Sequence, residues 1–320
     1  LVAGGLPLLL RVSARRAGAK GSQPRAYLHG SARWASQADI EAAGLLPSRA
    51  GRWRRLWPLP FKPAATDQGS VYVGAWIDPQ GRQRYLRHAG PEHVLCYAPT
   101  RSGKGVGLVV PTLLSWSQSA VVTDLKGELW AMTAGWRQQH AGNRVLRFEP
   151  ATTTGGCAWN PLDEIRLGTE QEVGDVQNLT TLMVDPDGKG LESHWQKTSQ
   201  ALLVGVILHL LYKAKAEDSQ ASLHGVDAML ADPQRDIAEL WMEMVTYGPR
   251  HGQNHPVVGA AARDMMDRPD EEAGPALPTA KTLPALYPNP VVAAITRRSD
   301  FLLRDLTPAS PAASHILLSP

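Results

Sequence analysis

The chain has 320 residues, 43% of them hydrophobic and 20% charged, which is the composition of a globular protein large enough to bury a sizeable core. It has only two cysteines, at positions that match no zinc-binding spacing. This excludes a disulfide framework and favours a reducing, cytoplasmic setting.

The formal net charge is +3, but the charge is unevenly distributed along the chain. Residues 1–60 contain ten Lys and Arg against two acidic residues, a local balance of +8 that leaves −5 for the remainder. A basic N-terminal part on a mildly acidic body indicates contact with a polyanion, either lipid headgroups or nucleic acid.

The N-terminal segment is apolar for ten residues and then basic. The apolar run is too short to cross a bilayer, which needs about 20 residues, and Arg11, Arg15, Arg16 and Lys20 follow it. This order is typical of the cytoplasmic end of a membrane helix, so we interpret residues 1–12 as the remnant of a transmembrane helix. A degraded signal peptide, which would carry its basic residues before the apolar run, and disordered sequence are the alternatives.

Residues 13–70 are rich in Arg, Pro, Gly and Ala, and we interpret them as a basic juxtamembrane connector. Within it, residues 36–43 predict a short helix with Ser36 as its N-cap. Val71–Trp76 and Arg82–Leu86 then flank a turn that has Pro and Gly where a type I turn favours them. We therefore expect a hairpin at the start of a nucleotide-binding domain, whose first part we place at residues 71–170.

Residues 94–114 have the order of a phosphate-binding loop of the Walker A kind. Val94–Tyr97 predicts a buried strand, and Gly103–Leu114 predicts a helix that Pro111 kinks. A loop between them offers backbone N–H groups and the positive end of a helix to an anion, and Lys104 can reach the β and γ oxygens. The candidate nucleotide-binding residues are Ala98, Pro99, Thr100, Arg101, Ser102, Gly103, Lys104, Gly105 and Val106.

The loop departs from the usual pattern at two positions. Ala98 stands where the first glycine is expected, and Gly105 stands where a Ser or Thr normally holds magnesium. The phosphate cradle is kept, but the usual metal ligand is not. The alternative interpretation is an ordinary glycine-rich turn between a strand and a helix, with Lys104 as a surface lysine.

A second candidate lies at the end of the next strand. Residues 119–123 predict a strand that leads to Asp124. Glu128–His140 predicts a helix, and Arg144–Phe148 predicts a third strand after the one at Val94–Tyr97. This alternation of strands and helices predicts a parallel sheet with right-handed crossovers. Ligands bind at the carboxyl ends of such strands. Asp124 is therefore a candidate catalytic residue that holds magnesium through water or orients the attacking water. The alternative is that it caps the following turn.

Helical periodicity dominates from residue 171 to about residue 270. Five helices are predicted, at Glu172–Met183, His194–Lys215, Leu223–Leu230, Ile237–Val245 and Val257–Asp267. We place an all-helical subdomain at residues 171–290, inserted into the α/β domain. The return to the nucleotide-binding domain is at residues 291–320, where Val291–Thr296 predicts a helix and Ile316–Leu318 a buried strand.

His251 and His255 are four residues apart, a spacing found in some metal sites. Gly252 and Pro256 make this segment a loop rather than a helix, and no Glu follows the first His. We interpret both histidines as solvated loop residues.

Several segments together resemble the coupling proteins of type IV secretion systems, of the TraG conjugal-transfer type. The resemblance runs from about residue 28 to the end and rests on His29–Ala35, Tyr85–His93, Ala98–Gly107, Asp124–Glu128, Asn160–Ile165, Asp185–Gly190, His194–Lys197 and Arg298–Phe301.

The resemblance implies an ATPase of the bacterial inner membrane, with the bulk of the chain in the cytoplasm and ATP and Mg²⁺ as cofactors. It implies a RecA-like nucleotide domain that carries an all-helical subdomain and assembles as a homo-oligomer, a hexameric ring. Its partners would be single-stranded DNA bound without sequence preference, a relaxase or effector proteins, and other secretion components. Lys104 would be the phosphate-binding lysine, and Gly105 a trait of the family.

One departure from the family concerns the second ATPase motif, an apolar strand that ends in Asp-Glu. We expect it beyond the end of this sequence, because the strand that ends at Asp124 has no adjacent Glu. We therefore expect this fragment to bind nucleotide weakly and hydrolyse it little, with the full-length protein as the ATPase. The alternative is a non-catalytic membrane adaptor that recruits cargo through the helical subdomain.

Overall fold

The computed structural model describes residues 33–46, 69–116, 118–152, 154–248, 252–268, 277–282 and 284–306, and the backbone of residues 314–318. They belong to two compact units, one formed by residues 1–57 and 75–87 and the other by residues 58–74 and 88–320. The helix remnant expected at residues 1–12 lies outside the described residues. Among the helices that are described, none is both long and apolar enough to cross a bilayer.

The first unit contains the short helix α2 (Gln37–Ala42), as the sequence predicts. Ser36 and Asp39 form a capping box, in which each side chain accepts a hydrogen bond from the other residue's backbone N–H. Asp39 also forms an ion pair with Arg33, whose Nη1 lies 2.6 Å from its carboxylate. The backbone N–H of Arg87 donates to the carbonyl oxygen of Leu45 at 2.8 Å and so connects this helix with the second strand of the hairpin.

The predicted hairpin is present as β1 (Val71–Ile77) and β2 (Gln83–His88). Asp78 organises the turn, because its buried carboxylate accepts hydrogen bonds from the backbone N–H of Arg82 at 2.8 Å and from the side chains of Arg82 and Arg84. Each strand is one residue longer than predicted, and the second strand begins one residue later, at Gln83.

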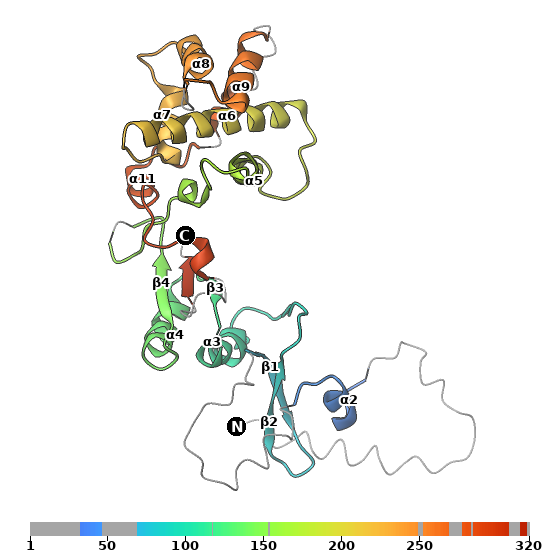
Figure 1. The fold of residues 1–320 in the computed structure, drawn as a ribbon. Helices are drawn as coiled ribbons and strands as arrows, with labels where there is room; N and C mark the ends of the chain where they lie inside the picture. Colours follow the sequence, from blue (N-terminus) through green and yellow to red (C-terminus); the bar gives the residue numbers. More distant parts are fainter. Residues whose placement is uncertain are drawn as a thin grey trace, which may run out of the picture. The chain divides into compact units, whose positions relative to one another are not determined.

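In the second unit three parallel strands form a sheet, which gives a mixed α/β structure (Figure 1). They are β3 (Ala120–Thr123), β4 (Arg144–Phe148) and β5 (Ser314–Leu318), in the order β3-β5-β4. The helix α4 (Glu128–Gln139) connects β3 with β4. The predicted parallel order is confirmed, and the last strand pairs between the two earlier ones, with Ile316 opposite both Val121 and Leu146.

The strand predicted at Val94–Tyr97 is wrong. These residues have no regular secondary structure, and Leu95 and Tyr97 are 76% and 90% exposed. A strand forms only when its backbone groups pair with a neighbour, and none of the described strands pairs with this segment. An apolar run predicts that a segment is able to form a strand, but the pairing partner lies elsewhere in the sequence.

The helix predicted after the loop is confirmed and runs over residues 104–115. Its first part, η3 (Gly105–Val109), is a π-helix, and its second part is α3 (Val110–Ser115). The N–H of Val110 donates to the carbonyl oxygen of Gly105, five residues earlier. The next residue, Pro111, has no N–H to donate. Pro111 thus coincides with a widened turn, in place of the simple kink that the sequence predicts.

All five helices predicted between residues 171 and 270 are present, each within one residue of the expected ends. They are α5 (Glu172–Val184), α6 (His194–Ala216), α7 (Leu223–Ala231), α8 (Ile237–Thr246) and α9 (Pro256–Met266). The long helix α6 is in contact with α5, α7 and α9 (Figure 1). Its apolar residues Leu203, Val206 and Ile207 are fully buried, and Gly205 allows close approach, because a Cβ there would lie 2.4 Å from that of Ala261.

Two segments join the helical region to the sheet, and we call them together the neck (residues 157–165 and 295–303). Trp159 donates its backbone N–H to Ile295 at 2.9 Å, and Asp300 donates its own to Ala158 at 2.9 Å. The neck includes the short helix η4 (Pro161–Glu164) and follows α11 (Pro290–Ile295), and the short helix η5 (Leu303–Leu306) begins where the neck ends. The segments Asn160–Ile165 and Arg298–Phe301, which the sequence analysis singled out, therefore meet here.

Candidate functional site

The candidate phosphate loop, residues 98–106, leads from the segment Val94–Tyr97 into the helix that begins at residue 104. Two of its residues have left-handed backbone conformations, Arg101 with φ 64° and Gly103 with φ 87°. The loop begins with a turn over residues 99–102, in which the N–H of Ser102 donates to the carbonyl oxygen of Pro99 at 3.2 Å. A side chain at position 103 would be strained by this φ. The glycine of the Gly-Lys pair is thus required by the shape of the loop.

The loop is open to solvent, apart from half-buried Ala98 and Gly105. A Cβ added at Gly103 or Gly105 would meet no atom within 4 Å. The space beside the loop is therefore free, as a phosphate cradle requires. The N-terminus of the helix over residues 104–115 also lies at this loop and favours a negative charge there.

Lys104 is folded back onto its own loop. Its ammonium donates to the carbonyl oxygens of Ala98 at 3.1 Å and Pro99 at 3.3 Å. The side chain thus stays at the loop instead of extending into solvent. An anion in the loop would compete with these two carbonyls for the ammonium, and an ionised phosphate oxygen is the stronger acceptor.

Asp124 lies directly after β3 and is buried, with 5% of its surface exposed. One carboxylate oxygen, Oδ2, accepts a hydrogen bond of 2.9 Å from the N–H of Trp130 in the first turn of α4. The N-cap residue of α4, Gly127, has no side chain to cap the helix. Asp124 therefore caps α4, as the alternative interpretation states, and the bond uses one of its two oxygens.

Of the two predicted catalytic residues, Lys104 and Asp124, only Asp124 has an oxygen ligand for a magnesium ion. Gly105 offers no hydroxyl, and no group of three or more His, Cys, Asp or Glu side chains suited to a metal occurs in the part of the chain that is described. A carboxylate at the end of a strand is nevertheless a hard oxygen ligand, which suits a magnesium ion that keeps most of its waters. Asp124 therefore fits a magnesium ion that takes its other ligands from water or from a bound anion.

The interpretation of His255 as a solvated residue is wrong. His255 is buried, and its Nε2 lies 3.1 Å from a carboxylate oxygen of Glu172, while its Nδ1 accepts from the N–H of Val257 and caps α9. Tyr212 donates to the other oxygen of Glu172 at 2.7 Å. The sequence contained the signal, because Pro256 is suited to the first position of a helix and places His255 at its N-cap. His251 lies outside the described residues.

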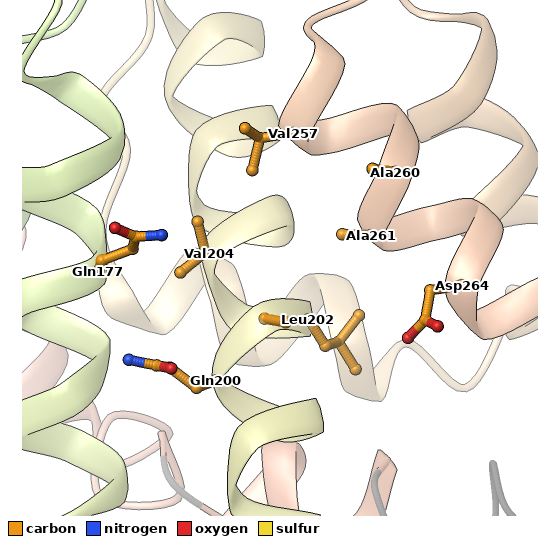
Figure 2. A pocket seen from close by; sticks show the side chains of 9 residues that line it. Gln177, Gln200, Leu202, Val204, Val257, Ala260, Ala261 and Asp264 are labelled. Carbon is orange, nitrogen blue, oxygen red and sulfur yellow. The ribbon is translucent and has the colours of Figure 1, made fainter. Parts of the chain in front are cut away.

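A hollow of about 270 Å³ opens between α5, α6 and α9 (Figure 2). In the view of Figure 2 the side chains of Gln177 and Gln200 lie on one side of it, and Ala260 and Ala261 of α9 lie on the other. Most of the described residues that line it are apolar, and Asp264 is the charged one among them. No residue of the phosphate loop lines it, so the helical region offers a surface of its own.

Comparisons with known proteins show the family to which this chain is related. The family model described as Type IV secretory system Conjugative DNA transfer matches residues 33–312. Two proteins from Escherichia coli named conjugal transfer protein TraG are 66% identical over 300 residues and 69% identical over 280 residues, covering 93% and 88% of this chain. The chain spans less than half of their length, 46% and 44%.

A solved structure gives a weaker likeness. The plasmid coupling protein TrwB in complex with a non-hydrolysable ATP analogue is 17% identical to this chain, with a TM-score of 0.48, over 86% of this chain and 55% of that one. The sequence matches, which are far stronger, decide the assignment.

Proposed function

The chain belongs to the Type IV secretory system Conjugative DNA transfer family, and from this membership we propose that it binds ATP at residues 98–106 as part of a coupling ATPase for conjugation. The proposal is carried by the phosphate loop, in which a left-handed glycine precedes Lys104 at the start of a helix. Family membership gives this loop a context that an ordinary glycine-rich turn would lack.

The residues of the loop account for nucleotide binding. Backbone N–H groups of the loop and the positive end of the helix bind the phosphates. The ammonium of Lys104 moves away from the carbonyl oxygens of Ala98 and Pro99 and donates to the β and γ oxygens instead. The oxygen of Asp124 that does not cap α4 would hold a magnesium ion through a water molecule. A magnesium ion bound there would supply positive charge that stabilises the charge developing on the transferred phosphoryl group. Phosphoryl transfer depends mainly on such positioning and charge.

For the whole protein we propose a motor of the inner membrane. The nucleotide-binding domain would be RecA-like, formed by residues 71–170 and 291–320 with the helical subdomain of residues 171–290 between them, and would act in a hexamer. It would deliver relaxase-bound single-stranded DNA or effector proteins to the secretion channel. Contacts with the DNA backbone would make binding salt-dependent and indifferent to sequence.

The test is nucleotide binding and turnover by the full-length protein with Lys104→Ala. Loss of a charge-assisted contact with phosphate costs about 1.5–3 kcal/mol, so the dissociation constant for ATP should rise roughly tenfold to a hundredfold. Lys215→Ala, at an exposed position in α6, is the matched control and should leave binding unchanged. Unchanged turnover and unchanged DNA transfer with Lys104→Ala would show that the motor proposal is wrong.

The second candidate is a non-catalytic adaptor that binds cargo through the helical region. The hollow between α5, α6 and α9 favours it, because an apolar hollow is a typical place for a partner's side chain. Ala260→Arg would fill this hollow from an exposed position on α9. An adaptor loses transfer with Ala260→Arg and keeps it with Lys104→Ala, whereas a motor loses transfer with Lys104→Ala.

A further inference from the structure

Arg137 is a fully buried cation on α4 that contacts the end of the phosphate-loop helix. Its Nη1 donates to the carbonyl oxygens of Leu113 at 2.7 Å and Trp116 at 2.5 Å, and its Nη2 donates to Gln118 at 3.1 Å. Leu113 belongs to α3, Trp116 is its C-cap, and Gln118 lies between α3 and β3. One guanidinium thus binds the end of α3 and the connection that follows it.

A buried guanidinium is costly, and an apolar side chain of similar size generally costs less. Burial lowers the pKa of Arg137, although Arg remains charged in proteins. Within the described part of the chain its three hydrogen bonds go to carbonyl oxygens, and two of these oxygens lie at the negative end of a helix. The side chain is therefore suited to hold this helix end in one position.

Neighbouring contacts fix the same helix end. The indole Nε1 of Trp136, next to Arg137, donates to the carbonyl oxygen of Leu114 at 2.9 Å. The backbone N–H of Tyr72 also donates to the hydroxyl of Thr112 at 3.0 Å. Because the helix runs from residue 104 to residue 115, its start at the loop depends on where its end is held.

The other end of α4 is connected to Asp124, which caps it through Trp130. The helix α4 therefore contacts the candidate magnesium residue at one end and the phosphate-loop helix at the other. This juxtaposition links the two parts of the proposed site through a single helix.

We propose that Arg137 is a positioning residue of the nucleotide site, which sets the phosphate-loop helix relative to Asp124. The proposal rests on the proposed function, because the site that is positioned is the proposed ATP site. Arg137 touches no phosphate in this role and acts through the carbonyls that it binds.

The experiment compares Arg137→Met and Arg137→Lys in the full-length protein. In the absence of nucleotide, hydrogen exchange of the amides of residues 105–116 should become faster in Arg137→Met. The dissociation constant for ATP should rise roughly tenfold, because binding groups lose effectiveness when they are slightly misplaced. Arg137→Lys, which keeps the charge and can still donate to the carbonyls, should restore part of both effects and also serves if Arg137→Met does not fold.

Val176→Ala is the control for a general loss of stability, since Val176 is fully buried in the helical region. It should lower the melting temperature without changing ATP affinity or the exchange of residues 105–116. If Arg137→Met lowers the melting temperature and leaves ATP affinity unchanged, Arg137 is merely structural and the proposal is wrong.

Failure of the proposed function gives a different result. If the unmodified protein binds no ATP, that proposal is wrong, and with it the role of Arg137 at a nucleotide site. Faster exchange in Arg137→Met would then still show that Arg137 holds the helix, whereas unchanged exchange would contradict this as well.

Discussion

The side-chain amide of Asn160 donates a hydrogen bond of 2.8 Å to the carbonyl oxygen of Ala221, which is 61 residues further along the chain. Asn160 is fully buried in the neck, and Ala221 directly precedes the residue that caps α7. The amide oxygen of Asn160 also accepts from the N–H of Leu162 at 3.1 Å. One side chain thus connects the segment that leaves the sheet with the helical region.

Replacing this side chain should therefore destabilise the protein. Asn160→Ala leaves the buried carbonyl oxygen of Ala221 without this donor, and an unsatisfied buried polar group costs about 1–3 kcal/mol. Urea unfolding followed by circular dichroism measures the change. Asn178→Ala, on the exposed face of α5, should stay within about 0.5 kcal/mol of the unmodified protein. Equal stability of the two variants would contradict the role given to Asn160.

Glu172 should be a second centre of stability, because it accepts hydrogen bonds from Tyr212 and Gly168 while it pairs with His255. Tyr212→Phe removes one buried donor to a carboxylate, which should cost about 1–3 kcal/mol. Tyr97→Phe, at a residue that is 90% exposed, is the matched control and should cost nothing measurable.

His255→Asn separates the two contacts that His255 makes. Asparagine is a good N-cap for α9 but is too short to keep the bond with Glu172. The variant should thus retain the helix and still lose stability in thermal unfolding. A melting temperature equal to that of the unmodified protein would show that the cap alone matters.

The helices could be predicted because their signal is local. Helix α6 has a continuous apolar pattern and a capping box between Ser193 and Gln196, so both its burial and its start follow from neighbouring residues. The strand that ends at Asp124 and the strand Arg144–Phe148 were likewise recognised from short β-branched and apolar runs. The sequence pattern that predicts each of these helices and strands lies within the helix or strand itself.

The errors and omissions concern contacts between distant residues. The segment Val94–Tyr97 has strand composition but no partner among the described strands. Arg137 binds carbonyl oxygens 19 to 24 positions away in the sequence, and Asn160 binds that of Ala221, 61 positions away. No periodicity reports such contacts, because they depend on how the elements pack.

The cluster around Glu243 predicts a loss of stability in acid. Burial opposes ionisation of Glu243, but hydrogen bonds from Lys213, Arg235 and His209 outweigh it and lower its pKa from 4.5 to about 2. A carboxylate whose pKa is lower in the folded than in the unfolded protein stabilises the fold at any pH above the unfolded pKa. This contribution is lost as the pH falls from about 4.5 to about 2. Burial lowers the pKa of His209, so protonation of His209 below its ordinary value of 6.5 destabilises the fold in the same direction.

Glu243→Gln tests this expectation. At pH 7 the variant should melt at a lower temperature, because the charge that pairs with Lys213 and Arg235 is gone. The two melting temperatures should converge as the pH falls towards 2, where Glu243 is itself protonated. Glu217→Gln, at an exposed position, is the control. A difference that stays constant from pH 7 to pH 2 would contradict the proposed ionisation.

Asp124 allows its structural and catalytic roles to be separated. Asp124→Ala removes the acceptor for the N–H of Trp130 and should cost about 1 kcal/mol of stability, the typical value of a helix cap. Asp124→Asn keeps an oxygen acceptor of the same size and should retain most of that stability. Both substitutions remove the negative charge. If Asp124 holds the water of a magnesium ion, either variant should therefore lose most of the ATP turnover. The melting temperature of the full-length protein measures the structural role, and its ATPase rate measures the catalytic role. Full turnover with Asp124→Asn would show that Asp124 only caps α4.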